Sequence, residues 1–449
     1  MAWEAEQDVG SKGRKRVGTA NGRRGRGIEV RLHFSRSSMA ARQFYFDVVC
    51  PFAYLASRRL AAVPGVEWTP VLLGGIYAAV KGKAAAGSSA SDGLAPARKH
   101  VLHQDLTREA ARSASPLVRP PGHPVRTLEA QRWLAAIDDP LARREAARAV
   151  YEAYWVDKLD VSDLSVINNV ADRLSLPPAD GETGGDVLRA NTAQAVERGA
   201  FGVPAVWAAN RLWHGGDRLH LVPGLGIDEM RATSDAMVRP GGTIDFFLDV
   251  ASPFSYIAAA RIHAFAERYG ATVNLKPILV GVLFQQVGTP MLPLFQASKA
   301  KQAYLMQDIA DLCADDVPFK WTSSFPLRSV TTNRMIIAEP RTLDCIYRAA
   351  WADNVNVGDD GELRKVLTAA GFDADALFAA AQDRDVKATL RENTEEAVAL
   401  GVCGVPTFRV NNGPLVFGSD RMSVVADLLC GWEDPAASWT AANETASKL

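Results

Sequence analysis

The feature that most constrains this chain is that it repeats itself. Residues 46–54 (Phe-Asp-Val-Val-Cys-Pro-Phe-Ala-Tyr) match residues 248–256 (Leu-Asp-Val-Ala-Ser-Pro-Phe-Ser-Tyr), 202 positions later. At nearly the same spacing, further matches follow in the same order: Pro124 with Pro326, Asn191 with Asn393, Gly202-Val203-Pro204 with Gly404-Val405-Pro406, and Asp217-Arg218 with Asp420-Arg421. A period near 200 residues is too long for a solenoid, so the pattern predicts two duplicated domains.

The repeat also sets the expected domain boundaries. The length of 449 residues alone favours roughly three domains. The repeat reduces this to two, predicted at residues 43–225 and 242–432. Between them, residues 226–241 contain glycine and proline with little apolar periodicity, which is typical of a linker. Residues 433–449 are predicted to be a polar tail.

The first 42 residues differ from the rest. They contain ten Lys and Arg residues against four Asp and Glu residues, a net of +6, and show no apolar periodicity. This composition predicts a basic disordered arm. Met39 lies just before the first strand-like run. A second interpretation is therefore that the natural chain starts at Met39. A transit peptide or a contact with nucleic acid is a third, which we favour less.

Composition excludes several classes of protein. The net charge of −1 argues against a chain that coats nucleic acid, and no apolar run approaches the roughly 18 residues of a membrane span. An odd number of widely spaced cysteines without a Cys-x-x-Cys pair argues against a disulfide framework or a structural zinc site. These are Cys50, Cys313, Cys345, Cys403 and Cys430. We therefore expect a cytoplasmic protein with no metal and with neither nucleic acid nor a membrane as its partner.

Each half is predicted to begin with a βαβ unit. Strands are expected at 43–49 and 66–73, and again at 243–250 and 272–280, with helices at 54–62 and 256–269 between them. A middle of about 100 residues is mainly helical in both halves, with helices expected at 126–137, 141–157, 164–174, 330–338, 343–352 and 362–369. Each half closes with a helix (187–198, 386–399), Gly-Val-Pro and a strand (203–208, 405–410).

This layout resembles the thioredoxin fold with an inserted helical domain. The predicted fold class is therefore α/β, with two tandem thioredoxin-like domains that each carry an α-helical insertion. Asp-x-x-Ser-Pro-Phe-Ser-Tyr at 249–256, Gly-Val-Pro at 404–406 and Gly-Ser-Asp-Arg at 418–421 resemble the 2-hydroxychromene-2-carboxylate isomerase family, with its kappa-class glutathione transferase and DsbA-like relatives. The resemblance covers nearly all of residues 43–432.

Ser252 is the first candidate catalytic residue. A residue between a strand and a helix N-terminus lies among unpaired backbone N–H groups at the positive end of the helix dipole. A serine there cannot perform thiol redox chemistry, but its hydroxyl can donate a hydrogen bond to a bound thiolate. Ser255, one helical turn later, is a second polar candidate and is predicted to contact the substrate. The alternative for Ser252 is a simple N-cap, a role that serine fills well.

The resemblance implies a glutathione site from the later motifs. It implies a cis peptide bond at Val405–Pro406, beside which an extended peptide can pair with the backbone. It also implies that Ser419, Asp420 and Arg421 bind the γ-glutamyl end of glutathione. The matching positions of the first half are Val203, Pro204 and Asp217.

The helical insertion offers substrate contacts. Trp321 and Arg328, with Lys320 and Arg334 nearby, could hold an anionic aromatic substrate by stacking and charge pairing. The alternative is that each is an ordinary core aromatic or surface charge.

The first half departs from the motif. Cys50 replaces Ser252, Ala53 replaces Ser255 and Gly216 replaces Ser419. At a helix N-terminus, Cys50 is predicted to have a low thiol pKa and to act as a peroxidatic, glutathionylated or nucleophilic residue. The alternative is a degenerate half that mainly packs against the second.

The function implied by the resemblance is glutathione-dependent isomerisation of 2-hydroxychromene-2-carboxylate to trans-o-hydroxybenzylidenepyruvate. Glutathione would be the cofactor, and the protein would be a monomer of two fused domains or a homodimer. Two alternatives stay open. One is a kappa-like glutathione transferase or DsbA-like thiol oxidoreductase, and the other is a non-catalytic module that binds glutathione or a peptide.

Overall fold

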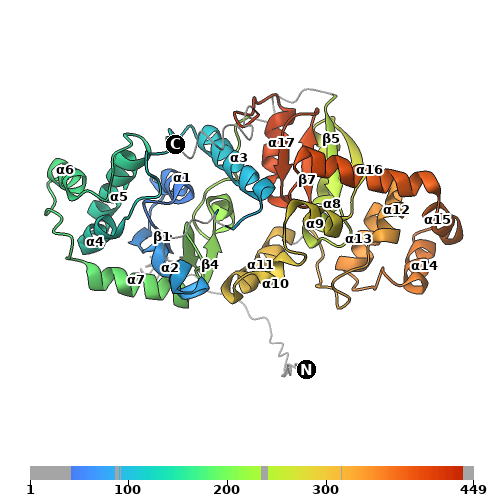
Figure 1. The fold of residues 1–449 in the computed structure, drawn as a ribbon, viewed down its shortest axis with the longest axis horizontal. Coiled ribbons are helices and arrows are strands. Elements are labelled where there is room, and N and C mark those ends of the chain that lie inside the picture. Colours follow the sequence, from blue (N-terminus) through green and yellow to red (C-terminus); the bar gives the residue numbers. More distant parts are fainter. Residues whose placement is uncertain (1–41, 86–90, 92, 234–240, 315, 438–449) are drawn as a thin grey trace, which may run out of the picture. The chain divides into compact units, whose positions relative to one another are not determined.

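Two four-stranded sheets of identical topology organise the protein (Figure 1). The computed structural model describes residues 42–85, 91, 93–233, 241–314 and 316–437. Each sheet has one parallel pair of strands, extended by two antiparallel strands, in the orders β2-β1-β3-β4 and β6-β5-β7-β8. The strands are β1 (Arg42–Phe46), β2 (Val66–Pro70), β3 (Ala205–Ala208), β4 (Arg211–His214), β5 (Thr243–Leu248), β6 (Thr272–Pro277), β7 (Thr407–Val410) and β8 (Leu415–Phe417).

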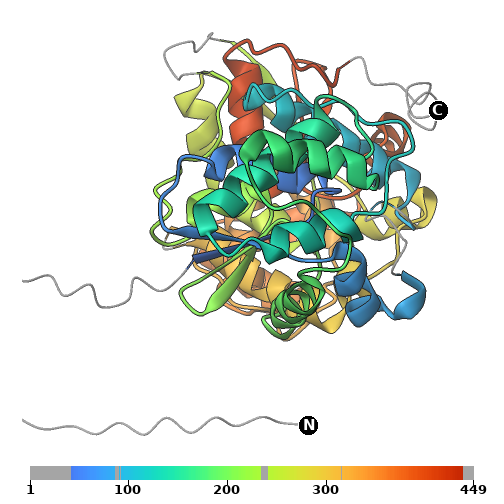
Figure 2. The same ribbon diagram turned by 90° about the vertical axis from the view of Figure 1, so that its left-hand side faces the viewer.

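Helices complete each half around its sheet. In the first half they are α1 (Pro51–Leu60), α2 (Leu73–Lys81), α3 (Pro96–Arg112), α4 (Leu128–Ala136), α5 (Pro140–Trp155), α6 (Leu164–Leu174) and α7 (Gly185–Glu197), with 3-10 turns η1 (Lys83–Ala85) and η2 (Gly216–Leu221). Figure 2 shows the teal and green insertion helices in front of the blue strands of this half. None of the helices in the described ranges is long and apolar enough to cross a membrane.

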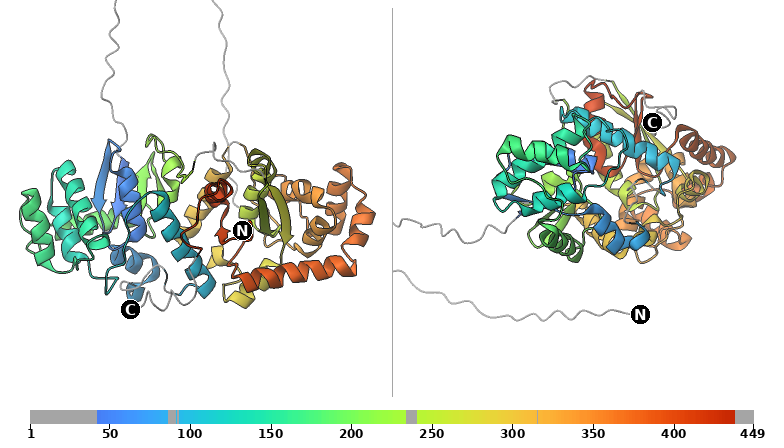
Figure 3. Two further views of the ribbon diagram at one scale, coloured as in Figure 1. Left: turned by 90° about the horizontal axis from the view of Figure 1, so that it is seen from above. Right: turned by 60° about the vertical axis from the view of Figure 1, so that its left-hand side comes forward.

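Within the described residues, the second half follows a similar order and adds the short helices α10, α15 and α17. Its helices are α8 (Pro253–Arg268), α9 (Val280–Val287), α10 (Pro293–Gln296), α11 (Lys299–Cys313), α12 (Val330–Ala338), α13 (Leu343–Trp351), α14 (Asp360–Ala369), α15 (Ala374–Ala380), α16 (Arg384–Leu400) and α17 (Met422–Leu429), with 3-10 turns η4 (Pro340–Thr342) and η5 (Ser419–Arg421). The long helix α16, orange-red in Figure 3, packs against β6, α9 and α12.

The predicted fold class is confirmed: both halves are thioredoxin-like and both carry helical insertions. The helices expected at 164–174 and 330–338 begin and end as predicted. Strand β1 begins at Arg42, the last residue of the predicted arm. The rest of that arm, residues 1–41, and the tail after residue 437 lie outside the described residues.

A buried aspartate fixes the turn at the end of each central strand. In the second half, Asp249 accepts hydrogen bonds from the N–H of Ala251 at 2.9 Å and of Val280 at 2.8 Å. The indole N–H of Trp351 donates to the carbonyl of Val250 at 2.9 Å. The first half uses Asp47 and Trp155 in the same way. These bonds satisfy backbone groups that the turn leaves unpaired, and they hold the start of the following helix in place.

The two halves have separate apolar cores and meet through charges. Each cluster of buried apolar residues lies wholly within one half. Helix α3 of the first half instead presents buried charged side chains to the second. Arg108 donates to Asp434 at 2.8 and 2.9 Å, and Arg112 donates to Asp427 at 2.8 Å. Because the side chains of Arg108 and Arg112 are only 1% and 5% exposed, these pairs exclude water.

Asp427 also binds the linker between the halves. Its carboxylate accepts hydrogen bonds from the guanidinium of Arg231 at 2.8 Å, from the N–H of Ala232 at 2.9 Å, and from the N–H and hydroxyl of Thr233 at 3.1 and 2.8 Å. One fully buried carboxylate on α17 therefore fastens both the linker and helix α3.

We expect Asp427→Ala to lower the free energy of unfolding by about 3 kcal/mol, because it leaves the buried guanidinium of Arg112 without its partner. Urea unfolding followed by circular dichroism measures the change. The matched control is Asp375→Ala, which removes an exposed ion pair with Arg364 and should cost at most about 1 kcal/mol. Equal effects of the two substitutions would contradict this role of Asp427.

Candidate functional site

Ser252 lies where β5 ends and α8 begins. Its hydroxyl accepts a hydrogen bond from the N–H of Ser255 at 3.2 Å and donates one to the carbonyl of Val405 at 3.2 Å. The N-cap interpretation is therefore confirmed. The same hydroxyl therefore links the N-terminus of α8 to the Gly-Val-Pro loop. Its role toward a thiolate stays a prediction.

The Gly-Val-Pro loop faces Ser252 in the way the resemblance implies. The Val405–Pro406 and Val203–Pro204 peptide bonds are both cis, which confirms that expectation. Within the described residues, the N–H of Val405 donates no hydrogen bond. The carbonyl of Pro406 accepts from the N–H of Gly418 at 3.0 Å, which ties this loop to the next one. The loop thus offers a backbone donor of the kind that pairs with an extended peptide.

Ser419 stands on that next loop, in η5. The residue is only 8% exposed, and its hydroxyl has no hydrogen-bond partner among the described residues. An unsatisfied buried hydroxyl is costly, and a ligand that hydrogen-bonds to it would remove that cost. Gly418 has φ +114°, and a Cβ there would lie 2.4 Å from Oδ1 of Asp420, so glycine is required for this turn.

The two Asp-Arg pairs meet each other across the boundary between the halves. Arg218 donates to Asp420 at 2.8 Å and to Asp308 of α11 at 2.7 and 3.0 Å. Arg421 donates to Asp217 at 2.7 Å and to Asp420 at 3.1 Å. Burial alone would raise the pKa of Asp217, but Arg218 and Arg421 together hold that pKa well below its usual value. The carboxylate of Asp217 is therefore ionised, and each guanidinium joins both halves.

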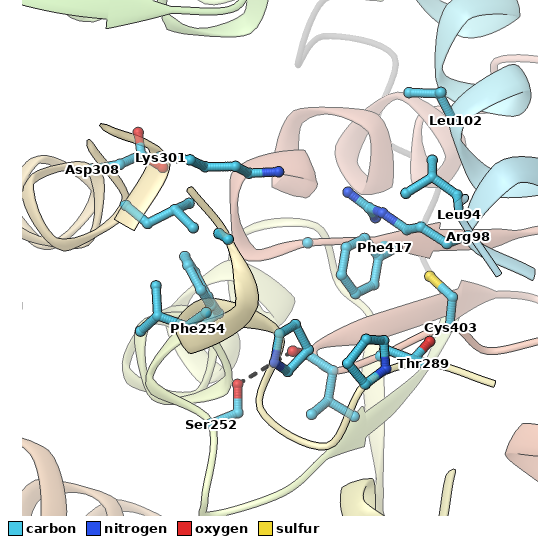
Figure 4. Close-up of a pocket in the computed structure, with 18 of the residues that line it drawn as sticks. Leu94, Arg98, Leu102, Ser252, Phe254, Thr289, Lys301, Asp308, Cys403 and Phe417 are labelled. Atoms are coloured by element: carbon cyan, nitrogen blue, oxygen red, sulfur yellow. Dashed lines mark hydrogen bonds between the residues drawn. The ribbon is translucent and has the colours of Figure 1, made fainter. Parts of the chain in front are cut away.

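One cavity of about 2530 Å³ connects these elements. It is lined from both halves, and Figure 4 shows the part around Ser252. Of the predicted site residues, the structure places all but Ser255 on its wall: Cys50, Val203, Pro204, Asp217, Ser252, Trp321, Arg328, Val405, Pro406, Ser419, Asp420 and Arg421.

The predicted substrate residues are placed differently from one another. Ser255 is fully buried beneath the helix terminus and does not line the cavity. Trp321 lies against Phe325 at 5.1 Å and Trp351 at 5.6 Å between ring centroids, so it forms part of an aromatic wall. Arg328 is exposed at the cavity edge. Among the described residues, no three His, Cys, Asp or Glu side chains gather so as to hold a metal ion.

The expected low pKa of Cys50 is wrong. Its thiol is buried and donates to the carbonyl of Val203 at 3.2 Å, as Ser252 does to Val405. Burial raises the pKa of this thiol to about 12, because water no longer stabilises a thiolate there, and the nearby Asp47 adds to the effect. The helix N–H groups at Ala53 and Phe52 oppose this shift without overcoming it.

Aromatic side chains surround the first-half loop. The ring of His214 lies 4.2 Å from that of Phe201, and Tyr304 of α11 accepts a hydrogen bond from the backbone N–H of His214 at 3.1 Å. Burial lowers the pKa of His214 to about 4, so the imidazole is neutral at pH 7. In the second half, Cys403 takes the place of Phe201 and Phe417 takes the place of His214. Conversely, the first half has Gly216 where the second has Ser419. The two half-sites therefore differ in chemistry.

Comparison with known proteins agrees with this geometry. The model of the DSBA-like thioredoxin domain matches residues 43–224 and 243–430. The chain belongs to the DSBA-like thioredoxin domain family. Glutathione S-transferase kappa 2 of Caenorhabditis elegans is 26% identical over 206 residues, 41% of this chain and 91% of that protein.

Two further relatives match a similar share of the chain. The 2-hydroxychromene-2-carboxylate isomerase of Sphingobium xenophagum is 26% identical over 192 residues, 42% of this chain and 97% of that protein. A solved structure of a 2-hydroxychromene-2-carboxylate isomerase is 22% identical, covers 42% of this chain and 94% of that one, and has a TM-score of 0.37. The resemblance to this group of DsbA-like proteins is confirmed, and its members include isomerases and glutathione transferases.

Several cavity residues of this DsbA-like chain were not foreseen from the sequence. Arg98 of α3 reaches the second-half site, while Lys301 and Tyr304 of α11 reach the first-half site. Each insertion thus contributes to the site of the opposite half. Their only sequence signal was a basic residue followed seven positions later by an aspartate, Arg98 with Asp105 and Lys301 with Asp308.

We expect native Cys50 to react at least about 100-fold more slowly with iodoacetamide at pH 7.5 than a free cysteine, since its pKa of about 12 leaves almost no thiolate. Peptide mapping by mass spectrometry after timed alkylation measures this rate. The urea-unfolded protein is the control and should react at the ordinary rate. Rapid labelling of Cys50 in the folded protein would contradict the assignment.

Proposed function

We propose that the second half binds glutathione and uses its thiolate to isomerise 2-hydroxychromene-2-carboxylate to trans-o-hydroxybenzylidenepyruvate. The observation that carries the proposal is the meeting of three groups in one cavity. These are the Ser252 hydroxyl, the Val405 backbone and the unpartnered Ser419 hydroxyl. The relatives named as kappa glutathione transferase and as isomerase support both the cofactor and the reaction class.

In this proposal each group has a separate task. Ser252 turns its O–H from the Val405 carbonyl to the glutathione sulfur, and the N-terminus of α8 stabilises the thiolate. Val405 pairs with the tripeptide backbone. Ser419 and Asp420 receive the γ-glutamyl end, where a hydroxyl suits the carboxylate and an aspartate suits the ammonium. Arg421 holds Asp420 in position from the ion-pair network.

The substrate then lies against the aromatic wall. Trp321 stacks on its ring, and Arg328 at the cavity edge pairs with its carboxylate. The ring C–O bond of the hemiketal first breaks, and the hemiketal proton passes to the phenol oxygen, which gives the open-chain cis enone. The thiolate adds to the carbon β to the new ketone, and the electron pair moves to the ketone oxygen as an enolate, so the former double bond becomes a rotatable single bond. After rotation, the enolate re-forms the double bond and expels the thiolate, so glutathione is not consumed. Positioning and stabilisation of the thiolate supply most of the rate increase.

Ser252→Ala is expected to lower kcat/KM at least about 100-fold in a spectrophotometric isomerase assay with saturating glutathione. Because the substitution also removes an N-cap, Asp373→Ala serves as the matched control. It removes the N-cap of α15, which does not line the cavity, and should keep full activity at a similar loss of about 1 kcal/mol. Cys50→Ser is predicted to keep activity. Activity that depends on Cys50 but not on Ser252 would move the site to the first half.

The same preparation distinguishes the alternatives. Conjugation of 1-chloro-2,4-dinitrobenzene without isomerisation would replace the proposal with a kappa-like transferase. Reduction of insulin disulfides would replace it with a thiol oxidoreductase. Glutathione binding without turnover of any of these substrates would leave a binding module.

Ser419→Ala is expected to raise the KM for glutathione about tenfold with little change in kcat, since it removes a hydrogen bond to a charged group of the cofactor. The melting temperature should not fall, because the hydroxyl has no partner within the described residues. The control is Ser423→Ala on α17, a buried serine that does not line the cavity. An unchanged KM in Ser419→Ala would remove Ser419 from the site.

A further inference from the structure

One carboxyl group in the ion network between the halves has no hydrogen-bond donor. Glu109 lies on α3, is only 8% exposed and lines the shared cavity. Among the described residues, its carboxyl group accepts no hydrogen bond. Its one ion-pair contact there is with Arg421 of the other half, whose Nη2 lies 4.0 Å from Oε1 of Glu109, beyond hydrogen-bond reach. A carboxylate in such a place is costly unless it holds a proton.

The duplication shows that this carboxyl group is an addition to the network. In the register that pairs Asp105 of α3 with Asp308 of α11, the counterpart of Glu109 is Leu312. In that second copy, Asp308 accepts from both Nε and Nη2 of Arg218, at 2.7 and 3.0 Å. One aspartate therefore satisfies that edge of the guanidinium.

The corresponding edge of Arg421 faces two carboxyl groups and is bound closely by neither. Its Nε lies 3.7 Å from Oδ2 of Asp105, and its Nη2 lies 4.0 Å from Glu109. Its Nη1 donates to Asp217 at 2.7 Å and to Asp420 at 3.1 Å. Four carboxyl groups thus surround one guanidinium. Their mutual repulsion favours a proton on the one that has no donor.

The remaining charges near Glu109 do not compensate it. These residues enclose a small pocket of about 30 Å³. Arg59 of α1 donates to two backbone carbonyls, at 2.6 and 2.8 Å. Arg108 and Arg112 of α3 are bound to aspartates of the second half. Glu229 of the linker adds another negative charge, and α17 contributes only uncharged side chains to this pocket.

We propose that Glu109 is a proton-controlled element of the contact between the two halves. Its carboxyl group is neutral in the folded chain below neutral pH and ionises as the pH rises through neutrality. The ionised group repels Asp105 and Asp217 and competes with them for Arg421, which weakens the contact. Because Arg421 joins the halves beside the shared cavity, the cavity should open more readily at alkaline pH.

The pKa of Glu109 agrees with this geometry. Burial is the main cause that raises the pKa to about 7, the positive charge of Arg421 opposes the shift, and Asp217 and Asp105 add to it. In the unfolded chain the same group has its ordinary pKa of 4.5, so between these two values the folded chain holds an extra proton. The stability that this proton contributes is full below the unfolded value and is lost as the pH rises through the folded value.

Thermal unfolding of the full chain and of Glu109→Gln from pH 5 to pH 8, at fixed ionic strength, tests the proposal. Glutamine has the shape of the neutral acid and cannot ionise. The melting temperatures should agree within about 1 °C at pH 5, and the variant should melt at least about 2 °C higher at pH 8. The control is Glu152→Gln, an exposed carboxylate on α5, whose effect should not change with pH.

Glu109→Leu is the second variant, and it keeps the test valid if the glutamine variant does not fold. Leucine is the residue type at the matching position of the second half and cannot ionise either. Whatever its melting temperature at pH 5, the difference from the wild type should shift by at least about 2 °C in favour of the variant at pH 8. A difference that is the same at every pH in both variants, or a shift of the opposite sign, would overturn the proposal.

Amide hydrogen exchange locates the effect. At pH 8, peptides from α3 and from η5 should exchange at least about threefold faster in the wild type than in Glu109→Gln, and at pH 5 they should exchange equally. Peptides from α6, which packs against α4 and α5, serve as the internal control and should not differ. Equal exchange of α3 in the two proteins at pH 8 would overturn the role of Glu109 in the contact. None of these measurements uses glutathione, so their outcome is independent of the proposed function.

Discussion

The reciprocal pairing of Asp217 and Arg218 with Asp420 and Arg421 is the interaction on which the arrangement of the two halves depends. Removing a charge from water costs several kcal/mol, so buried ions are stable only when their partners are well placed. Here each arginine contacts aspartates from both halves, and Asp308 adds a further carboxylate for Arg218. Since each apolar core lies within one half, it does not fix their relative orientation, and these charges with those of α3 do.

This contact gives the two copies a shared cavity and lets them differ inside it. In a symmetric homodimer every substitution appears twice, once in each site. In a fused chain one copy can change alone. The first half carries Cys50 and Gly216 where the second carries Ser252 and Ser419. Both halves nevertheless keep the cis-proline loop and the buried aspartate at the end of the central strand. The scaffold is therefore retained while the chemistry of the two sites diverges.

The sequence predicted most of what repeats and little of what joins the repeats. Strands, the insertion helices and the position of Ser252 followed from apolar periodicity, proline placement and motif spacing. Helices α3 and α11 did not, because their buried faces are charged. Asp105, Arg108 and Glu109 are buried on α3, and Asp308 on α11, so an apolar stripe is weak. The predicted low pKa of Cys50 was also wrong. The sequence shows that Cys50 lies at a helix N-terminus, but it does not show how deeply the thiol is buried, and burial dominates its pKa.

A charged face on α3 also suits the order in which such a chain is made. Arg108 pairs with Asp434, 326 residues later, so the partner is synthesised long after α3. An apolar face would be exposed during that interval and prone to aggregation. A face of arginine and carboxylate is instead solvated by water until the second half folds. The ions need to lose that water only when their partners in the second half are in place.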